Sequence, residues 1–380
     1  MSIINRDVMK LMDEWLFQGK TLILYGARQV GKTTLSKTIL KAYQSDAGYY
    51  NCELLPVKQL FERQDLSEMK QVFADQRVLV FDEAQHIQGI GWILKTLHDT
   101  YPEMQMIATG SSSFSLSSEM QEPLTGRALE FMLFPFSYTE LKQIYAPLDL
   151  KQAISTFMRF GQYPEIVLEE TEQKRITLLH NLTSKYLFKD IYELENLKRP
   201  EILLRLLQAL ALQVGNEVSF HELSNHLSVH VKTVQRYLEL LEKAFVIYRL
   251  KPLSRNLRIE INVKEKCYFY DLGIRNALIN NFNPMDLRDD AGALWENFCF
   301  MERLKFLQSQ GLVPQVYFWR THTQKEIDYV EEHDGSFFAY EFKWNPKARQ
   351  KKHTLFEEHY GGNVKTITPL NIDSLFHTTV

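Results

Sequence analysis

The chain has few cysteines and no long apolar run, and both absences limit what kind of protein it can be. Its three cysteines, Cys52, Cys267 and Cys299, lie far apart among 380 residues and lack the close spacing of metal ligands. An odd, widely spaced set fits a reducing compartment better than a disulfide scaffold. No apolar stretch reaches the roughly 18–20 residues that a membrane-spanning helix requires. The first residues also lack the pattern of a secretory signal. We therefore expect a cytoplasmic protein with no membrane partner.

Excess charge of one sign is also absent. The formal net charge is −3, and 24% of the residues are charged. Nucleic-acid-binding domains are often strongly basic, so any such surface in this chain must come from a local group of residues. A hydrophobic content of 45% is enough to form a core in each domain. At roughly 100–200 residues per domain, the length predicts two or three domains.

The first third of the sequence alternates short apolar runs with helical patterns. The apolar runs predict four strands, at 21–25, 49–52, 77–81 and 104–109. Helical spacing of apolar residues predicts helices within 3–18, 33–44 and 92–101. Strands that alternate with helices indicate a mostly parallel sheet covered on both faces.

A glycine-rich motif lies between the first predicted strand and the helix that follows it. It has the spacing G-x-x-x-x-G-K-T, and its residues are Gly26, Ala27, Arg28, Gln29, Val30, Gly31, Lys32 and Thr33. In this context the backbone N–H groups of the loop and the N-terminus of the helix bind phosphates. The lysine contacts the β- and γ-phosphates, and the threonine hydroxyl ligates Mg²⁺. The motif therefore predicts a site for ATP and Mg²⁺, with Thr34 as a further nucleotide contact.

Two carboxylates, Asp82 and Glu83, follow the predicted strand at 77–81. Ligands of open α/β sheets bind at the carboxyl ends of the strands. We expect Asp82 to hold Mg²⁺, directly or through water, and Glu83 to polarise the attacking water. An ordinary pair of surface acids is the alternative, and the four apolar residues before the pair argue against it.

Three further polar residues have two interpretations each. Thr109 and Ser111 follow the fourth predicted strand. Either could orient the attacking water, or both could serve as a cap or turn. Arg127 could act as an arginine finger on the phosphate of a neighbouring subunit, which predicts ATP-dependent homo-oligomers. The alternative is a solvated or ion-paired arginine.

Together these motifs resemble those of an AAA-type ATPase family that is widespread in bacteria and archaea and related to the signal-transducing NTPases called STAND. The segments that carry the resemblance are 26–34, 81–85, 109–113 and 124–127. Relatives have a Gly-x-Pro element in a helical lid that touches adenine. The similar stretch Gly161-Gln162-Tyr163-Pro164 has one residue more between Gly and Pro. The resemblance covers the whole chain and implies Pro164 as a base contact, with a plain loop turn as the alternative.

The segment 217–250 has the pattern of a helix-turn-helix. A short helix capped by Ser219 precedes a turn at 228–230 and a longer helix at 231–245. Apolar runs at 246–250 and 267–270 could be the two strands of a wing. In a DNA-binding version the second helix enters the major groove by its N-terminal residues. The outward side chains there are Lys232, Thr233, Gln235 and Arg236. A winged helix that serves as a spacer or binds protein is the alternative.

Carboxylates and a lysine accompany the last strand candidates. A helix at 293–307 precedes apolar runs at 315–319, 326–330 and 337–343. Asp328 lies in the second run, and alternation puts Glu341 and Lys343 on one face of the third. Glu296, on the preceding helix, could join them. Such a group forms a hard-oxygen site for a second Mg²⁺ or Mn²⁺, in which lysine activates water or stabilises the charge on a cleaved phosphodiester.

This pattern resembles the restriction-endonuclease-like PD-(D/E)XK fold, although Ile327 rather than proline precedes Asp328. The resemblance implies that Asp328, Glu341 and Lys343 are catalytic, with Glu296 as the helix-borne acid found in some members. Three alternatives stay open for this region: a metal-dependent nuclease, a domain that binds DNA without cutting it, and an α/β interaction module.

The sequence thus predicts an α/β protein in four parts. These are an AAA-type ATPase core at 1–136, a helical lid at 137–212, a winged helix-turn-helix at 213–285 and a nuclease-like α/β domain at 286–380. The leading hypothesis is an enzyme that binds and hydrolyses ATP and acts on DNA. One alternative is a nucleotide-state switch that binds DNA or protein and has an inactive nuclease site. Another is a transcription regulator.

Overall fold

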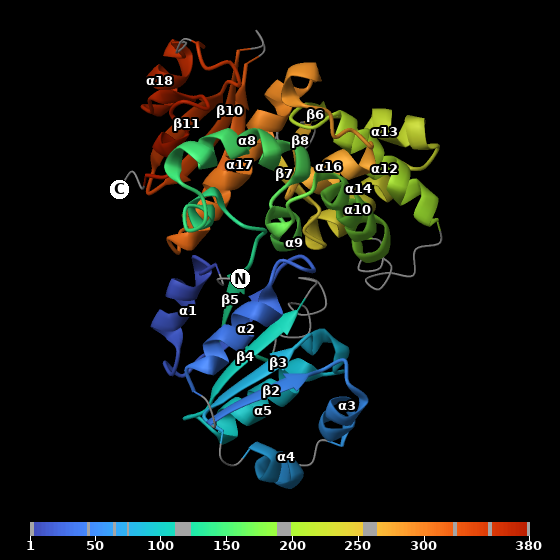
Figure 1. Cartoon of the computed structure of the whole chain (residues 1–380), viewed down its shortest axis with the longest axis vertical. Coiled ribbons are helices and arrows are strands. Elements are labelled where there is room, and N and C mark those ends of the chain that lie inside the picture. Colours follow the sequence, from blue (N-terminus) through green and yellow to red (C-terminus); the bar gives the residue numbers. More distant parts are fainter. Residues whose placement is uncertain are drawn as a thin grey trace. The chain divides into compact units, whose positions relative to one another are not determined.

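The computed structural model describes residues 4–43, 46–63, 66–73, 76–110, 123–187, 199–253, 264–321, 325–348 and 352–377. The chain forms two compact units (Figure 1). The main part of the first is Met1–Phe136, and the second is made from Ser137–Lys185, Leu197–Glu242 and Val246–Val380. Within the described ranges, every helix is too short or too polar to cross a membrane.

The first unit contains a five-stranded parallel sheet with the order β2-β3-β4-β1-β5. Its strands are β1 (Thr21–Tyr25), β2 (Ala47–Asn51), β3 (Val78–Asp82), β4 (Gln105–Gly110) and β5 (Ala128–Met132). Its helices are α1 (Val8–Trp15), α2 (Lys32–Lys41), α3 (Leu55–Glu62), α4 (Leu66–Phe73) and α5 (Ile90–Thr100). Strands β3 and β4 are buried along their whole length, as expected of parallel strands covered on both faces.

The parallel arrangement brings three predicted site segments to one edge of the sheet. The glycine-rich loop follows β1, Glu83 follows β3, and Thr109 lies near the end of β4. Strand β4 pairs with both β1 and β3 and therefore lies between them. Because the carboxyl ends of parallel strands meet at the same edge, side chains from β4 can reach both the loop and the acidic pair.

The four strands predicted for this unit are confirmed, with boundaries that differ by one or two residues. Strand β5 and the helices α3 and α4 were not predicted. Strand β5 lies at the edge of the sheet, and most of its residues are only partly buried, so it lacks the apolar run that marked the central strands. Helices α3 and α4 bury Phe61 and Phe73, whose rings contact each other and Phe81 of β3.

The second unit begins with helices and ends with a mixed sheet. Its helices are α7 (Tyr138–Leu141), α8 (Pro147–Phe160), α9 (Pro164–Leu168), α10 (Glu172–Asn181), α12 (Pro200–Leu212), α13 (Phe220–Leu227), α14 (Val231–Lys243), α16 (Leu272–Leu278), α17 (Ala291–Ser309) and α18 (Thr354–Tyr360). Its strands are β6 (Glu217–Val218), β7 (Ile247–Pro252), β8 (Glu265–Phe269), β9 (Gln315–Arg320), β10 (Glu326–His333), β11 (Ser336–Phe342) and β12 (Val364–Ile367). Of these, β6, β12, α16 and α18 were not predicted from the sequence.

These seven strands form one continuous sheet, with the order β12-β11-β10-β9-β7-β8-β6. The connection is between β7 and β9, which pair in parallel with Lys251 opposite Tyr317 and Pro252 opposite Phe318. The strands predicted for the wing and for the C-terminal domain therefore share a sheet, and the predicted boundary at 285 does not separate two sheets. The predicted boundary at 136 falls at the same residue as the division between the two units.

Close backbone approach fixes the helical part of the second unit. Gly273, in α16, lies against the end of α8, and a Cβ added to it would lie 2.1 Å from the carbonyl oxygen of Phe160. Gly161 has a φ of +74°, and a Cβ there would lie 2.0 Å from Oδ1 of Asp271. Asp271 in turn accepts hydrogen bonds from the backbone N–H groups of Gln162 and Ile274. Residues 161–163 are thus held rigidly against α16.

We predict that Gly273→Ala destabilises the protein, because the added methyl group must displace the backbone of α8. Overpacking of this kind costs about 1–3 kcal/mol. Gly292→Ala, in the first turn of α17, is the matched control because a Cβ added there would meet nothing within 4 Å. That substitution should be neutral or stabilise by up to about 1 kcal/mol. Urea unfolding of both variants measures the difference, and equal free energies of unfolding would contradict the packing described.

Candidate active sites

The glycine-rich loop has an unusual backbone at both of its glycines. Gly26 has a φ of +153°, and a Cβ there would lie 2.1 Å from the carbonyl oxygen of Leu133. Gly31 has a φ of +103° and immediately precedes α2. Arg6, from the segment before α1, is buried and donates hydrogen bonds to the carbonyl oxygens of Val30 (2.7 Å) and Phe134 (2.5 Å). Glycine conformation and the Arg6 contacts together hold the loop open between β1 and α2.

Lys32 begins α2 and is buried. Its ammonium group donates hydrogen bonds to the carbonyl oxygens of Gly26 and Ala27, both at 2.9 Å. The positive charge therefore lies over the loop, at the N-terminus of a helix where backbone N–H groups already favour an anion. The other predicted nucleotide contacts lie in the same segment. Arg28, Gln29 and Val30 are in the loop, and Thr34 is in the first turn of α2.

Asp82, at the end of β3, receives hydrogen bonds from three different segments. Thr33 Oγ1 donates to its Oδ2 at 2.8 Å, and the hydroxyl of Tyr49 in β2 donates to the same oxygen. Thr109 Oγ1 donates to Oδ1. Asp82 is only 3% exposed, so these donors compensate for the buried charge. Thr33 and Asp82, both predicted as Mg²⁺ ligands, are thus adjacent.

Thr109 also positions Glu83. Its hydroxyl oxygen accepts a hydrogen bond from the backbone N–H of Glu83 at 3.1 Å while its proton is donated to Asp82. Glu83 has a φ of +53°, a left-handed conformation that is rare for a residue with a side chain and is often found at functional sites. The Gln85 side chain donates a hydrogen bond to the Glu83 carboxylate at 2.6 Å. Ser111, the other predicted water-orienting residue, lies outside the described residues.

Tyr49 was not predicted as a site residue. Burial, and then the hydrogen bond to Asp82, raise the pKa of its hydroxyl above the usual range, so it remains a hydrogen-bond donor. The Lys37 ammonium lies 4.8 Å from the centre of its ring. A tyrosine in a predicted strand usually packs in the core, and the sequence has no signal that its hydroxyl reaches an acid on the neighbouring strand.

Arg127 lies at the opposite edge of the sheet from the glycine-rich loop. It immediately precedes β5, and its carbonyl accepts a hydrogen bond from Thr21 at the start of β1. Its side chain forms an exposed ion pair with Asp99 at 2.8 Å. This placement excludes contact with the phosphates of its own loop. A finger acting on a neighbouring subunit stays a prediction.

Pro164 begins α9, in the second unit, after the rigid turn at 161–163. The side chain of Gln162 in that turn accepts a hydrogen bond from Lys305 of α17 at 3.0 Å. Lys305 also pairs with Glu302, whose carboxylate accepts from the backbone N–H of Tyr138. The contact of Pro164 with a nucleotide base stays a prediction.

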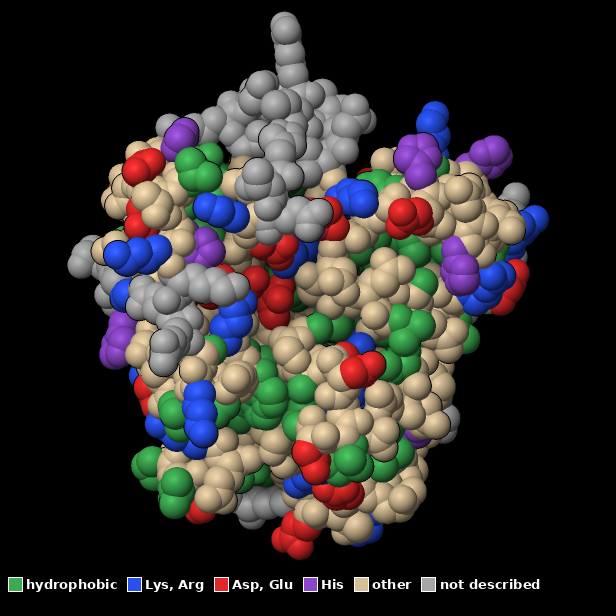
Figure 2. All heavy atoms as spheres, turned by 90° about the horizontal axis from the view of Figure 1, so that it is seen from above, with side chains coloured by type: hydrophobic (Ala, Val, Ile, Leu, Met, Phe, Trp, Pro, Cys, Tyr) green, Lys and Arg blue, Asp and Glu red, His purple; other side chains and the backbone are tan. Residues whose placement is uncertain are grey.

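The predicted helix-turn-helix has the expected elements. Ser219 caps α13 by accepting a hydrogen bond from the backbone N–H of Glu222, which confirms the predicted cap. Strand β8 pairs antiparallel with both β6 and β7. In α14 the side chains of Lys232, Gln235 and Arg236 are exposed, and Thr233 is partly exposed. On the face seen in Figure 2, lysine and arginine side chains are interspersed with acidic and histidine side chains.

Asp328, Glu341 and Lys343 come together in the C-terminal part of the sheet. The Lys343 ammonium lies 3.4 Å from Oδ2 of Asp328 and 3.8 Å from Oε1 of Glu341. The pairing of β10 with β9 shifts by one residue between Ile327 and Val330, so a β-bulge or other irregularity lies in the stretch that contains Asp328. Bulges re-aim side chains beside functional sites. Asp328 also accepts a hydrogen bond from the backbone N–H of Phe342 at 2.8 Å.

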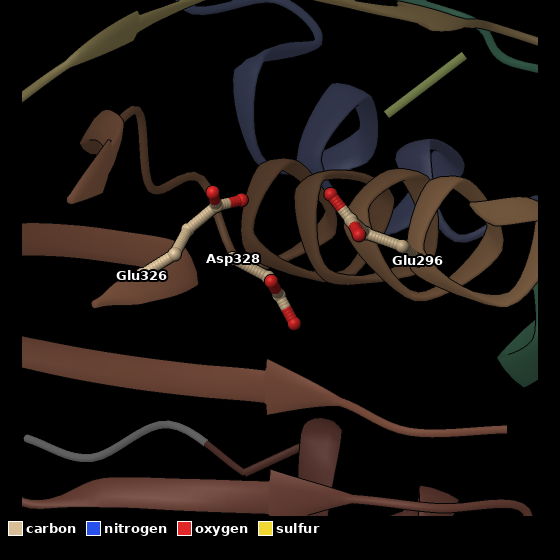
Figure 3. A group of neighbouring side chains, drawn as sticks. All are labelled: Glu296, Glu326 and Asp328. Carbon is tan, nitrogen blue, oxygen red and sulfur yellow. The ribbon is translucent and has the colours of Figure 1, made fainter. Parts of the chain in front are cut away.

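Glu296 lies beside Asp328, together with a third acid, Glu326 (Figure 3). One oxygen from each of the three carboxylates lies within 4.8 Å of the others. Burial, and then the charge of Asp328, raise the pKa of Glu296 to about 7, against the opposing effect of Lys266. Lys266, in β8, lies 2.9 Å from Glu296 and 2.5 Å from Glu326. The predicted residues of this region thus form one charged group.

Three members of this group were not predicted. Glu326 lies two residues before Asp328 in β10, and strand alternation could have placed it on the same face. Lys266 is a charged residue within an otherwise buried strand, but its partners are distant in sequence. His353, whose Nε2 lies 3.3 Å from Oε1 of Glu341, has no sequence signal at all.

Comparison with known proteins identifies the first unit. Residues 18–142 match a family model described as "AAA domain". Residues 151–285 and 291–369 match models described as "Domain of unknown function (DUF8612)" and "Domain of unknown function (DUF4143)". An uncharacterized protein of Methanocaldococcus jannaschii is 26% identical over 92% of this chain and 80% of its own length. An uncharacterized protein of Mycobacterium tuberculosis is 26% identical over 90% of this chain and 74% of its own length.

Among solved structures, the chain is similar to the RuvB Holliday junction branch migration motor of Thermotoga maritima. The sequence identity is 19%, the TM-score is 0.33, and the match covers 64% of this chain and 88% of the other. The family match at 18–142 agrees with the five-stranded parallel sheet, the glycine-rich loop after β1 and the acid at the end of β3. Residues 18–142 therefore match an AAA domain and have a fold like that of a P-loop ATPase.

Proposed function

We propose that this chain hydrolyses ATP with Mg²⁺ and uses the second unit to bind DNA and cleave its phosphodiester bonds. The observation that carries the first part is the convergence of Lys32, Thr33, Asp82 and Thr109 at one edge of the sheet. The second part rests on the grouping of Asp328, Glu341 and Lys343. The two parts are tested separately.

The residues of the ATPase site fit a bound Mg²⁺–nucleotide. Thr33 and Asp82 offer the hard oxygen ligands that Mg²⁺ prefers, and the ion would neutralise phosphate charge. Lys32 exchanges its hydrogen bonds with the loop carbonyls for phosphate oxygens. Glu83, released from Gln85, accepts a proton from the attacking water as general base. Thr109 holds the carboxylate of Asp82 and the backbone of Glu83 in place.

We predict that Thr109→Val lowers the turnover of ATP by about 10–100-fold, the usual cost of removing a group that orients a metal ligand. Valine has the same shape but cannot donate to Asp82 or accept from Glu83. Thr109→Ser, which keeps the hydroxyl, should retain most of the activity. Phosphate release measures turnover, and a fluorescent nucleotide measures affinity, which should stay nearly unchanged in both variants. Wild-type turnover in Thr109→Val would contradict the role of this hydroxyl.

The DNA-binding part of the proposal rests on α14. The exposed side chains of Lys232, Gln235 and Arg236 lie at its N-terminal half, the part of a recognition helix that enters the major groove. The antiparallel order of β6, β8 and β7, together with α12, α13 and α14, supports a winged helix. Lysine and arginine there can contact phosphates, and glutamine and arginine can read base edges.

We predict that Lys232→Ala combined with Arg236→Ala weakens binding of duplex DNA by at least about tenfold, since a lost arginine contact to a base costs about 1–3 kcal/mol. Lys174→Ala combined with Lys365→Ala removes the same charge from exposed sites elsewhere in the second unit and should have little effect. Fluorescence anisotropy at fixed salt measures both. If both double variants weaken binding equally, the effect is one of net charge alone, which would contradict the docking of α14 into the DNA groove.

The nuclease part rests on the chemistry of the group around Asp328. Asp328 and Glu341 offer oxygen ligands for a divalent cation, which would polarise a phosphodiester and lower the pKa of water. The Lys343 ammonium, close to both acids, can stabilise the charge that develops on the cleaved phosphate.

We predict that plasmid DNA is cleaved in the presence of Mg²⁺ or Mn²⁺ and that Glu341→Gln and Lys343→Met abolish this cleavage. Lys365→Met removes an exposed lysine from the neighbouring strand β12 and should cleave like the wild type. Gel electrophoresis of the products, with thermal melts to confirm folding, measures the outcome. Cleavage by folded Glu341→Gln at the wild-type rate would assign the activity to another site or to a contaminant.

A nucleotide-state switch is the second candidate. The observation in its favour is the hydrogen bond by which Gln85 holds the Glu83 carboxylate. This bond engages one oxygen of the Glu83 carboxylate, and we expect hydrolysis to be slower while it persists. A switch of this kind binds ADP tightly and turns over ATP slowly, whereas a motor or nuclease that consumes ATP has rapid turnover in the presence of DNA.

A further inference from the structure

The acidic group formed by Glu296, Glu326 and Asp328 is already in contact with a positively charged side chain, Lys266. Glu296, Glu326 and Asp328 place three carboxylates within 4.8 Å of one another, an arrangement that is unstable without positive charge. The side chain of Lys266 is only 2% exposed and contacts Glu296 and Glu326 directly. Tyr268, two residues further along β8, donates a hydrogen bond to the same oxygen of Glu296 at 2.7 Å. Lysine and tyrosine therefore share one oxygen of Glu296, and the lysine also contacts Glu326.

The backbone of Lys266 cannot move away from this position. Its strand, β8, lies between β6 and β7, and Lys266 is paired with Glu217 on one side and Leu250 on the other. Arg320 of β9 contacts Glu217 of β6 at 2.8 Å and Glu326 of β10 at 3.6 Å, which links β9 to both of these strands. The strand pairing and the two carboxylates thus fix the position of the Lys266 ammonium.

The other side of Asp328 is different. Glu341 is 3% exposed, and its Oε2 has no hydrogen-bond partner among the described residues. Its Oε1 faces Lys343 at 3.8 Å and His353 at 3.3 Å. A buried carboxylate oxygen without a donor is costly, and such an oxygen beside a second carboxylate is suited to a divalent cation. On the side of Glu296 the acids are therefore neutralised by Lys266, whereas on the side of Glu341 they can bind a divalent cation.

We propose that Lys266 occupies the position of a second cation, so that the C-terminal site takes a single divalent ion, held by Asp328 and Glu341. This inference rests on the proposed phosphodiesterase site and specifies its metal content. Two-metal sites stabilise both the attacking and the leaving oxygen with metal ions. In this chain Lys266 is too deeply buried to touch a substrate, and it acts as a positioning residue that neutralises Glu296 and Glu326. Lys343 then provides the mobile positive charge beside the one metal ion.

Counting Mn²⁺ ions by electron paramagnetic resonance tests the proposal on the full chain without nucleotide. The number of ions bound by the double variant Asp328→Asn/Glu341→Gln is subtracted from the number bound by the wild type. The difference leaves out the ions bound at other sites. The expected difference is one ion per chain. Lys266→Met keeps the length of the side chain but removes the charge, which frees the oxygens of Glu296 and Glu326, and it should bind one ion more than the wild type. Lys266→Met/Glu296→Gln, which removes both charges of the pair, should return to the wild-type count.

A wild-type difference of two ions, or of none, would overturn the proposal, and so would a folded Lys266→Met that gains no ion. If Lys266→Met does not fold, the wild-type difference and the double variant decide. A purely structural lysine would change the melting temperature without adding a metal ion. Plasmid cleavage, measured in parallel, separates the two claims. Cleavage with two ions bound retains the proposed function and rejects the role of Lys266, whereas one ion without cleavage does the reverse.

Discussion

A buried carboxylate on a strand is the constraint on which both sites depend. Asp82 and Asp328 are almost inaccessible to solvent, yet each has the environment of a charged group. The fold surrounds Asp82 with hydroxyl donors from α2, β2 and β4, and it surrounds Asp328 with a backbone N–H group and a lysine. Donors of this kind stabilise the charge without occupying every lone pair, so a metal ion can still bind.

The sheet order explains why these donors are available. In the first unit, β4 lies between the strand that leads to the phosphate loop and the strand that leads to the acids, so Thr109 can bridge Asp82 and Glu83. In the second unit, the pairing of β7 with β9 joins the strands of the predicted wing to the strands that carry Asp328 and Glu341. Because β8 pairs with β7 in this sheet, Lys266 of β8 lies close enough to contact the acidic group. Lys266 and Tyr268 therefore connect β8 directly to the acidic group.

Sequence patterns predicted the parts of the structure that are encoded locally. Apolar runs marked the central strands of the first unit, and the spacing of Gly26, Gly31 and Lys32 marked the phosphate loop. The edge strand β5 was missed because its residues are only partly buried and form no apolar run. Tyr49, Lys266 and His353 were missed because each gains its role from partners distant in sequence, and a strand pattern does not specify which strands become neighbours. Glu326 is the exception, since alternation from Asp328 was sufficient to find it.

The proposed function requires that the ATPase site and the phosphodiesterase site of one chain are coupled. A comparison of the rate of plasmid cleavage with and without ATP, in the wild type and in Lys32→Ala at constant free Mg²⁺, tests this coupling. We expect ATP to change the rate of cleavage by the wild type and to have no effect on Lys32→Ala, because the variant lacks the ammonium that binds the phosphates. The coupling would be contradicted if ATP changed the cleavage rate equally in both proteins, or if ATP changed it in neither.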